Sequence, residues 1–217
     1  MLDLSIRSNE TELMDDLSRP DSEFVEAYIE LTAINKYLGG IRAVERFLPD
    51  GLLSVLDVAS GACDVGEALV RRRKCRVVSL DMNPRGLKFA SRTAPVAGDA
   101  LQLPFADREF DAVICSLFFH HLTNAECVSV LREMWRVARR MVIVNDLHRN
   151  RVAHASIRIL SALFSRSTMF RNDSAASVRR AFRPRELEDI AKQAGVPARV
   201  YRSFPYRLVL VATREET

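Results

Sequence analysis

The feature of the sequence that most constrains the fold is a regular alternation of short apolar runs and helical segments between Leu52 and Asp146. Five runs read as strands, at residues 53–57, 76–81, 95–98, 110–116 and 141–145. Helices are predicted between them, at residues 65–73, 84–90 and 124–138. Strands that are apolar throughout and separated by helices indicate a parallel sheet covered on both faces. The pattern therefore predicts an α/β, Rossmann-like, doubly wound domain, which binds ligands at the carboxyl ends of its strands.

Helices and a final hairpin flank this alternating body. Before it, helices are predicted at residues 22–37 and 41–47. After it, the sequence predicts helices at 152–164 and 184–194, then strands at 199–203 and 206–212. A terminal hairpin makes one strand of the sheet antiparallel. We expect residues 1–49 to form an N-terminal helical cap segment and residues 50–217 the ligand-binding unit, within one structural domain overall.

Composition excludes several classes of protein. The 217 residues carry 32 Lys and Arg against 28 Asp and Glu, and this net charge of +4 without a basic stripe indicates no nucleic acid partner. No run approaches the ~18 apolar residues that span a bilayer, and the first residues are too polar for a signal peptide. We therefore expect a cytoplasmic protein with a small-molecule partner and no membrane span; the sequence leaves a homodimer open. Four cysteines without a C-x-x-C pair and four histidines without an H-E-x-x-H pattern predict no metal site.

Acidic residues end three consecutive strands of the predicted sheet. Asp57 ends the first and precedes a loop that contains Gly61 and leads into a helix. Such a loop directs backbone N–H groups and a helix N-terminus at a ligand carboxylate or phosphate. Asp81 and Asp99 end the next two strands and offer acceptors for ribose hydroxyls and for an exocyclic amine. Alternatively, the loop is a plain strand–helix connection and Asp81 or Asn83 caps the next helix. Together the three acids predict a nucleoside-binding edge.

The segments VLDVASGACD, VVSLDMNP, GDALQLPFADREFDAV and SLFFHHL resemble the class I S-adenosylmethionine-dependent methyltransferases over roughly residues 50–146. The resemblance is closest to the small-molecule branch that includes the ubiquinone/menaquinone methyltransferases. The LPF-x-D-x-x-FD stretch is specific to that branch. INKYLGGIR at 34–42 and SVRRAF at 177–182 resemble bacterial methyltransferases found beside polyketide synthases, which implies secondary metabolism. The resemblance implies a seven-stranded sheet with S-adenosylmethionine as methyl donor and S-adenosylhomocysteine as product.

The resemblance also implies roles around the first loop. Asp57 would bind the methionine amino group, and the backbone of Ala59, Ser60 and Gly61 would receive its carboxylate. The sequence departs from the family here, because Ala59 and Cys63 stand where the family usually has glycines. The Cys63 side chain must point away from the cofactor, or the loop must be displaced.

The resemblance implies further cofactor contacts at the next strands. Asp81 would hold the ribose hydroxyls, with Met82 packed on the adenine. Asp99 would accept from the adenine amine, with Ala100 beside it.

Catalysis is expected at the ends of the fourth and fifth strands. By resemblance, Cys115 and Ser116 would flank the sulfonium. Methyl transfer to a phenol or enol oxygen needs a group that removes its proton, and histidine is the usual choice. His120, His121 and His148 are the candidate bases; the alternative is a structural role at a helix start.

Four residues are candidates for binding the acceptor. Asn145 and Asp146 follow the fifth strand and offer partners for a hydroxyl, or else cap the next helix. Phe170 lies on a stretch interpreted either as a lid over an aromatic or acyl substrate or as an ordinary amphipathic helix on the core. Tyr37 would complete that lid, or else it is a surface residue at a helix end.

We therefore expect a methyltransferase that acts on a small aromatic or polyketide-derived acceptor, by O-methylation of a phenol or enol. Carbon methylation of a quinone-like ring is the nearest alternative. A nicotinamide-dependent oxidoreductase would need G-x-G-x-x-G after the first strand, and SGACDVG lacks it. A non-catalytic member of the fold stays open because fold alone does not fix function.

Overall fold

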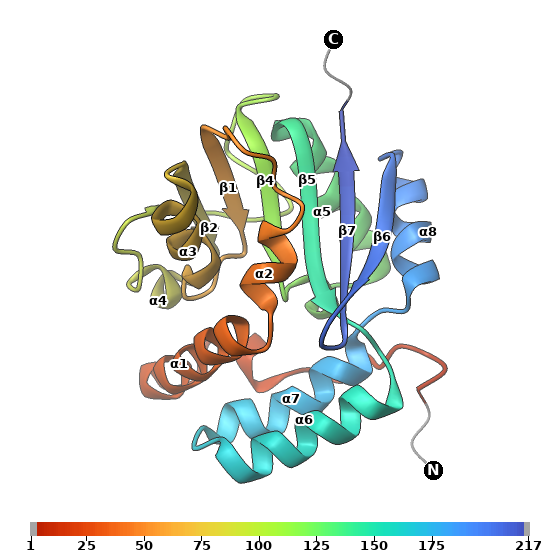
Figure 1. The fold of residues 1–217 in the computed structure, drawn as a ribbon. Coiled ribbons are helices and arrows are strands. Elements are labelled where there is room, and N and C mark those ends of the chain that lie inside the picture. Colours follow the sequence, from red (N-terminus) through yellow and green to blue (C-terminus); the bar gives the residue numbers. More distant parts are fainter. Residues whose placement is uncertain (1–3, 215–217) are drawn as a thin grey trace.

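The computed structural model describes residues 4–214. A seven-stranded sheet lies at its centre, in the order β3-β2-β1-β4-β5-β7-β6 (Figure 1). Its strands are β1 (Ser54–Val58), β2 (Arg76–Asp81), β3 (Ala94–Ala97), β4 (Phe110–Ser116), β5 (Ala138–Leu147), β6 (Ala198–Ser203) and β7 (Arg207–Thr213). Strands β1 to β5 pair in parallel, whereas β7 is antiparallel to β5 and β6. The predicted Rossmann-like fold and its antiparallel terminal hairpin are confirmed.

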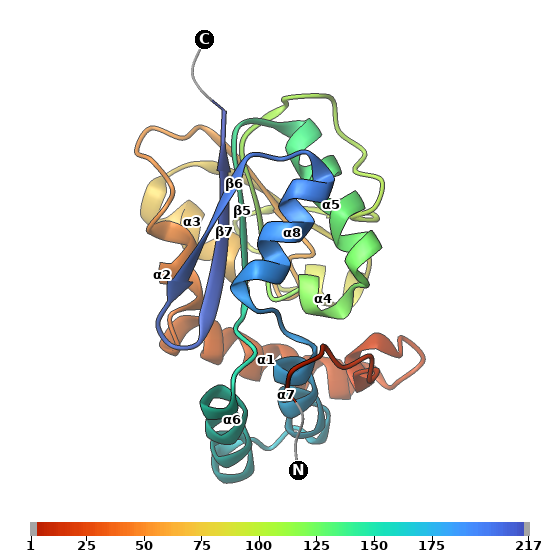
Figure 2. The ribbon, with the colours of Figure 1, turned by 90° about the vertical axis from the view of Figure 1, so that its right-hand side faces the viewer.

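Helices cover both faces of the sheet, as an all-apolar parallel sheet requires (Figure 2). The helices are α1 (Asp21–Tyr37), α2 (Gly40–Glu45), α3 (Asp64–Arg73), α4 (Pro84–Leu87), α5 (Asn124–Val137), α6 (Arg151–Phe164), α7 (Thr168–Arg180) and α8 (Pro184–Ala194). Two short 3-10 turns, η1 (Leu13–Asp15) and η2 (Phe119–His121), complete the described elements. One hydrophobic core lies between the sheet and α5 and α8, and a second between the sheet and α2 and α3. None of the helices in residues 4–214 is long and apolar enough to cross a membrane.

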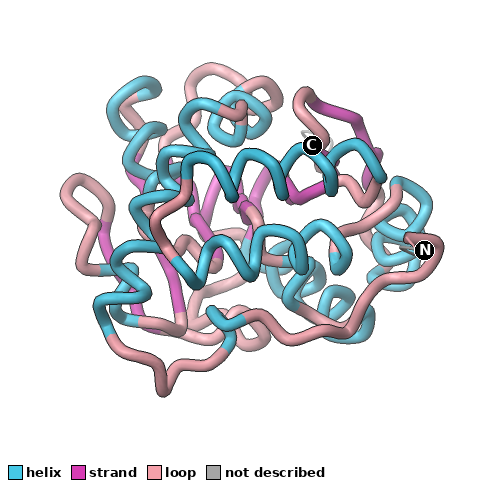
Figure 3. Tube along the Cα trace, turned by 90° about the horizontal axis from the view of Figure 1, so that it is seen from below, coloured by secondary structure: helices cyan, strands magenta, loops and turns pink. Residues whose placement is uncertain are grey.

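Three helices lie beyond the carboxyl ends of the parallel strands instead of on a face. Figures 1 and 3 show α1, α6 and α7 across this end of the sheet. A small third core that includes Phe24, Tyr28 and Met169 joins α1 and α7 to the loop after β1. The ends of β1, β2, β4 and β5 therefore face a roof of helices rather than open solvent.

Two predicted boundaries differ from the structure for identifiable reasons. Helix α4 ends at Leu87, not near residue 90, because the chain turns back toward Glu67. The Glu67 carboxylate accepts hydrogen bonds from the backbone N–H groups of Ser91, Arg92 and Thr93. Strand β5 is longer than 141–145, because its last residues continue the pairing with β7 as far as Leu147 opposite Arg207.

A buried arginine fixes the N-terminal segment to the rest of the chain. Arg149 is 1% exposed, and its guanidinium donates to the carbonyls of Leu4 (3.1 Å) and Ala181. It also forms an ion pair with Glu186, with Nη2 2.6 Å from Oε1. These contacts hold the segment that precedes η1 against the end of α7 and the start of α8.

We predict that Arg149→Met lowers the free energy of unfolding by about 1–3 kcal/mol, the usual cost of leaving buried acceptors without a donor. The N-terminal segment loses its anchor and becomes more sensitive to protease. Urea unfolding and limited proteolysis check both effects. The exposed Arg158→Met is the control, and equal urea midpoints for the two variants would contradict the assignment.

Candidate functional site

A cavity of about 460 Å³ lies between the carboxyl ends of the strands and the roof of helices. Its polar wall comes from the loops after β1, β2, β3 and β4, and its apolar wall mainly from α1, α6 and α7. Pockets of roughly 300–1,000 Å³ with mostly apolar walls and a few placed polar groups are typical of small-molecule sites. The cavity is therefore the candidate active site.

Asp81 connects the loop after β1 to the loop after β2. Its Oδ2 accepts a hydrogen bond from the Gly61 N–H and its Oδ1 from the Asn83 N–H, both at 2.7 Å. Each carboxylate oxygen has a further lone pair for a ligand hydroxyl. Asn83, not Asp81, caps α4, since its side chain accepts from the Arg85 N–H at 3.1 Å. Asn83 is therefore the N-cap of α4, and Asp81 lines the cavity.

Two further carboxylates, those of Asp57 in β1 and Asp64 in α3, lie near the start of α3. Asp57 is 1% exposed and accepts from the Gly66 N–H at 3.1 Å. Burial raises the pKa of Asp57 well above its ordinary value, and the nearby Asp64 adds to the shift. Burial also raises the pKa of Asp64 to about 6, despite a hydrogen bond from Asn35 and the charge of Arg207. Asp64 Oδ2 has no hydrogen-bond partner among the described residues. This part of the cavity therefore favours a cation.

The loop after β1 accommodates its two unusual residues without obstructing the cavity. Ala59 and Cys63 both have positive φ, 53° and 59°, the conformation that glycine adopts most readily. Cys63 is fully buried and does not line the cavity; its Sγ lies 3.6 Å from Ser60 Oγ. Its side chain thus points into the protein, the first of the two arrangements expected for this residue.

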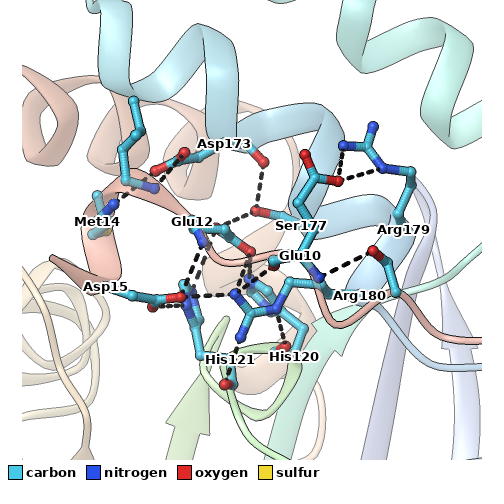
Figure 4. Close-up of polar contacts among 12 residues, drawn as sticks. Glu10, Glu12, Met14, Asp15, His120, His121, Asp173, Ser177, Arg179 and Arg180 are labelled. Atoms are coloured by element: carbon cyan, nitrogen blue, oxygen red, sulfur yellow. Dashed lines mark hydrogen bonds and ion pairs between the residues drawn. The ribbon is translucent and has the colours of Figure 1, made fainter.

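Two adjacent histidines at η2 meet the N-terminal segment inside the cavity (Figure 4). His120 Nδ1 lies 2.7 Å from Asp146 Oδ1, and His121 Nδ1 lies 2.7 Å from Asp15 Oδ1. Their Nε2 atoms lie 3.9 Å and 3.8 Å from the carboxylate oxygens of Glu12. Burial raises the pKa of Glu12 to about 7, although His121, Ser177 and Arg180 oppose the shift.

The cavity brings together most of the predicted site residues. Lining it are Asp57, Ala59, Ser60, Gly61, Asp81, Met82, Asp99, Ala100, Ser116, His120, His121 and Phe170. Asp146 does not line it but contacts His120 from behind. Asn145 is fully buried and donates to Ser116 Oγ at 2.7 Å.

Like Asn145 and Asp146, three further predicted residues lie away from the cavity wall. Tyr37 is 74% exposed at the end of α1, because its ring points outward from the helix face that carries Tyr28. The backbone N–H of His148 donates to the carbonyl of Tyr206, and His148 pairs with Phe182 in an isolated β-bridge. These contacts hold His148 beside the β6–β7 hairpin. Cys115 is wholly buried in the core between the sheet and α5.

Sequence reasoning missed Glu12, Asp64 and Gly86. Glu12 lies in a polar stretch with no motif, so no local signal marks it. Asp64 directly follows the first loop, at the start of a predicted helix. That position could have marked it as a candidate ligand-binding residue. Gly86 packs so closely on the first loop that an added Cβ would lie 2.1 Å from the Gly61 carbonyl oxygen.

These residues fit S-adenosylmethionine. The buried carboxylates of Asp57 and Asp64 suit the charge of its ammonium group and nearby sulfonium, and the Asp64 oxygen without a partner can accept a hydrogen bond from the ammonium group. Asp81 has free acceptor capacity for ribose hydroxyls, and Asp99 lies on the same wall.

We predict that Gly86→Ala displaces the Gly61 carbonyl and with it the loop that the cofactor would contact. Relieving a contact of 2.1 Å requires backbone movement, since neither atom belongs to a flexible side chain. Binding of S-adenosylhomocysteine, measured by calorimetry, should weaken by at least about tenfold, and overpacking should lower stability by about 1–3 kcal/mol. Lys88→Ala, exposed at the end of the same helix, is the control. Unchanged affinity in the Gly86 variant would show that the loop tolerates the shift.

Comparison with known proteins agrees with this geometry. Residues 55–141 match the model of a methyltransferase domain family. The demethylmenaquinone methyltransferase of Thermotoga maritima is 35% identical over 104 residues, which cover 46% of this chain and 44% of that protein. The corresponding enzyme of Deinococcus radiodurans is 38% identical over 92 residues, covering 38% of this chain and 37% of that protein. The matches thus span less than half the length of these curated relatives.

Solved structures share the fold over nearly the whole chain. An S-adenosylmethionine-dependent methyltransferase from Aquifex aeolicus superposes with a TM-score of 0.66 at 16% identity, covering 90% of this chain and 98% of that one. Human N-acetylserotonin methyltransferase, in complex with S-adenosylmethionine, superposes with a TM-score of 0.70 at 14% identity, covering 94% of this chain and 59% of that one. With its strand order and its antiparallel hairpin, the chain has the fold of these S-adenosylmethionine-dependent methyltransferases, and its residues 55–141 match a methyltransferase domain.

Proposed function

We propose that the protein transfers a methyl group from S-adenosylmethionine to a small, largely apolar acceptor with an acidic hydroxyl on an aromatic or enol system. The observation that carries this proposal is the single cavity in which a wall of buried carboxylates meets a wall of apolar helices. The carboxylates suit a cationic, nucleoside-containing donor, and the apolar helices suit a hydrophobic acceptor.

The chain's own residues would hold the cofactor at the strand ends. Asp57 and Asp64 would bind its ammonium group, Asp81 its ribose hydroxyls and Asp99 its adenine amine. The cofactor supplies an electrophilic methyl group on its sulfonium. The protein must align the acceptor with that methyl and exclude water, since proximity and orientation supply most of the catalysis in such a transfer.

The acceptor would bind under the helical roof. Leu31, Ile34, Ile157, Leu160 and Phe170 come from α1, α6 and α7 and line this part of the cavity. The histidines of η2 and Glu12 add ionisable side chains to the wall of the same cavity. An acceptor with an apolar body and one ionisable hydroxyl matches this division.

Carbon methylation of a quinone-like ring is the second candidate. The relatives named above are demethylmenaquinone methyltransferases, whose name indicates a quinone substrate. A phenolate oxygen makes demands on the cavity similar to those of a ring carbon that is activated by an ionised hydroxyl. An assay should therefore look for both the O-methylated and the C-methylated product.

The test is a binding titration followed by turnover. S-adenosylmethionine and S-adenosylhomocysteine should bind with micromolar affinity by calorimetry, with NADH as a control that should not bind. Asp81→Ala should weaken binding by about 1–3 kcal/mol, the scale of hydrogen bonds to a charged group. Phenols and quinols with apolar side chains then serve as acceptors, and mass spectrometry of the products distinguishes O-methyl from C-methyl. No binding of either sulfur compound would favour a non-catalytic member of the fold.

We further predict that cofactor affinity depends on pH through Asp64. The pKa of Asp64 is about 6 in the free protein, so a positive ligand binds its ionised form and must displace a proton below that pH. Affinity for S-adenosylhomocysteine should therefore fall roughly tenfold between pH 7 and pH 5. In Asp64→Asn the dependence should be shallower, and a curve that matches the wild type would remove Asp64 from the site.

The same raised pKa has the opposite consequence for the stability of the free protein. An acid with a raised folded-state pKa stabilises the fold only while protonated, and that contribution is lost as pH rises from about 4 through about 6. Asp64→Asn should therefore raise the free energy of unfolding at pH 7.5, by up to about 3 kcal/mol, as measured in urea.

A further inference from the structure

Three side chains in the cavity direct polar atoms at one another without a hydrogen bond that joins them. Glu12, His120 and His121 each offer one possible ligand atom within 4.8 Å of the other two. The Nε2 atom of His120 lies 3.9 Å from Glu12 Oε1, and that of His121 lies 3.8 Å from Oε2. Glu12 Oε2 accepts from Ser177 Oγ at 2.7 Å, but the buried Oε1 has no hydrogen-bond partner among residues 4–214. The Glu12 side chain is only 3% exposed, so bulk water does not satisfy that oxygen.

The outer contacts of the two histidines fix which nitrogen faces Glu12. Each Nδ1 lies 2.7 Å from an aspartate, Asp146 for His120 and Asp15 for His121. Carboxylates accept hydrogen bonds, so both Nδ1 atoms carry a proton, and Nε2 is the nitrogen that each histidine would offer to a metal ion. A histidine whose outer nitrogen donates to a carboxylate is the arrangement that orients imidazoles as metal ligands.

The charges around the cluster also favour a cation. Three carboxylates, Glu12, Asp15 and Asp146, are in contact with the histidines. Two guanidinium groups, those of Arg7 and Arg180, lie nearby, and both donate to the backbone carbonyl of His120. Acidic side chains thus outnumber the arginines around the cluster. Arg180 does not fill the gap: its Nη1 is 3.8 Å from Glu12 Oε1, and its donors are directed to Asp15 and to the carbonyls of Glu10, His120 and His121.

We propose that Glu12, His120 and His121 form a binding site for one divalent transition-metal ion of the zinc, cobalt or iron(II) class. Two imidazoles and one carboxylate suit these ions better than magnesium or calcium, which prefer all-oxygen sites. Ligand atoms around a tetrahedral zinc lie about 3.3–3.4 Å apart, given bonds of about 2.0–2.1 Å, so the 3.8–3.9 Å separations close by small side-chain rotations.

The proposed site is open toward the cavity. All three ligands line the cavity, and sites with three protein ligands typically keep a position for water or a substrate oxygen. The role of the ion toward the acceptor rests on the proposed methyl transfer: its charge would favour ionisation of the acceptor hydroxyl, with the proton released to water. The histidines would then be ligands, not the proton acceptors that the sequence predicts.

The test is a titration of the chelator-treated full-length protein with Co²⁺, followed by visible d–d absorption. We expect saturation at one ion per chain, displacement by Zn²⁺ and no displacement by Mg²⁺. Glu12→Gln keeps the size of the side chain and the acceptor for Ser177, yet should weaken Co²⁺ binding at least about 100-fold. Asp146→Asn, behind His120, should weaken it by about 10–100-fold, as outer-shell changes do. His148→Asn, outside the cluster, should bind Co²⁺ like the wild type.

Any of three results would overturn the site. They are the absence of Co²⁺ absorption in the wild type, Co²⁺ binding by Glu12→Gln that is as tight as that of the wild type, or a loss of Co²⁺ affinity in His148→Asn that is as large as that in Glu12→Gln. If Glu12→Gln does not fold, as judged by circular dichroism, His121→Asn takes its place, and a one-to-one Zn²⁺-dependent rise in the Tm of the wild type is required. S-adenosylhomocysteine binding is measured on the same samples, so a lost metal site and a wrong methyltransferase assignment give different outcomes.

Discussion

The burial of carboxylates at the carboxyl ends of parallel strands is the constraint on which the site depends. Asp57, Asp64 and Asp81 are withdrawn from water with few compensating donors, mainly the backbone N–H groups of Gly61, Asn83 and Gly66. Burial of a charge without a partner is costly, and these groups respond with raised pKa values. The free protein therefore carries a local destabilisation that a cationic cofactor removes, the usual relation between stability and function at a binding site.

The N-terminal segment adds a wall to the cavity at this edge of the sheet. It passes under α7, and its position is fixed by guanidinium groups from distant parts of the chain: Arg149 holds Leu4, and Arg180 holds Glu10 and Asp15. Asp173 adds hydrogen bonds to the N–H groups of Leu13 and Met14. Because these anchors are charged and buried, the segment is a fixed wall that places Glu12 opposite the histidines, not a loose extension.

The sheet and the acidic residues at its strand ends could be predicted because their signals are local. Apolar runs of strand length and acids at strand ends require nothing from remote residues, and β2, β4 and α8 begin and end where the pattern places them. The Glu12 cluster could not be predicted, since its third member comes from a polar stretch whose position depends on tertiary contacts. The same holds for Tyr37, whose aromatic side chain predicted a lid although its place on α1 turns it outward.

In the proposed reaction, the electrostatics of one cavity would serve two partners of opposite demand. A wall of carboxylates would attract a cationic donor, but the same wall would oppose ionisation of a hydroxyl on the proposed acceptor, because like charges disfavour one another at short range. The Arg180 guanidinium beside the histidines is already engaged with Asp15 and three backbone carbonyls, so it offers little to a new anion. A bound dication is often the largest local charge in a site and reverses its pKa logic. The proposed ion at Glu12, His120 and His121 would thus reconcile an acidic cofactor site with an acceptor that reacts as an anion.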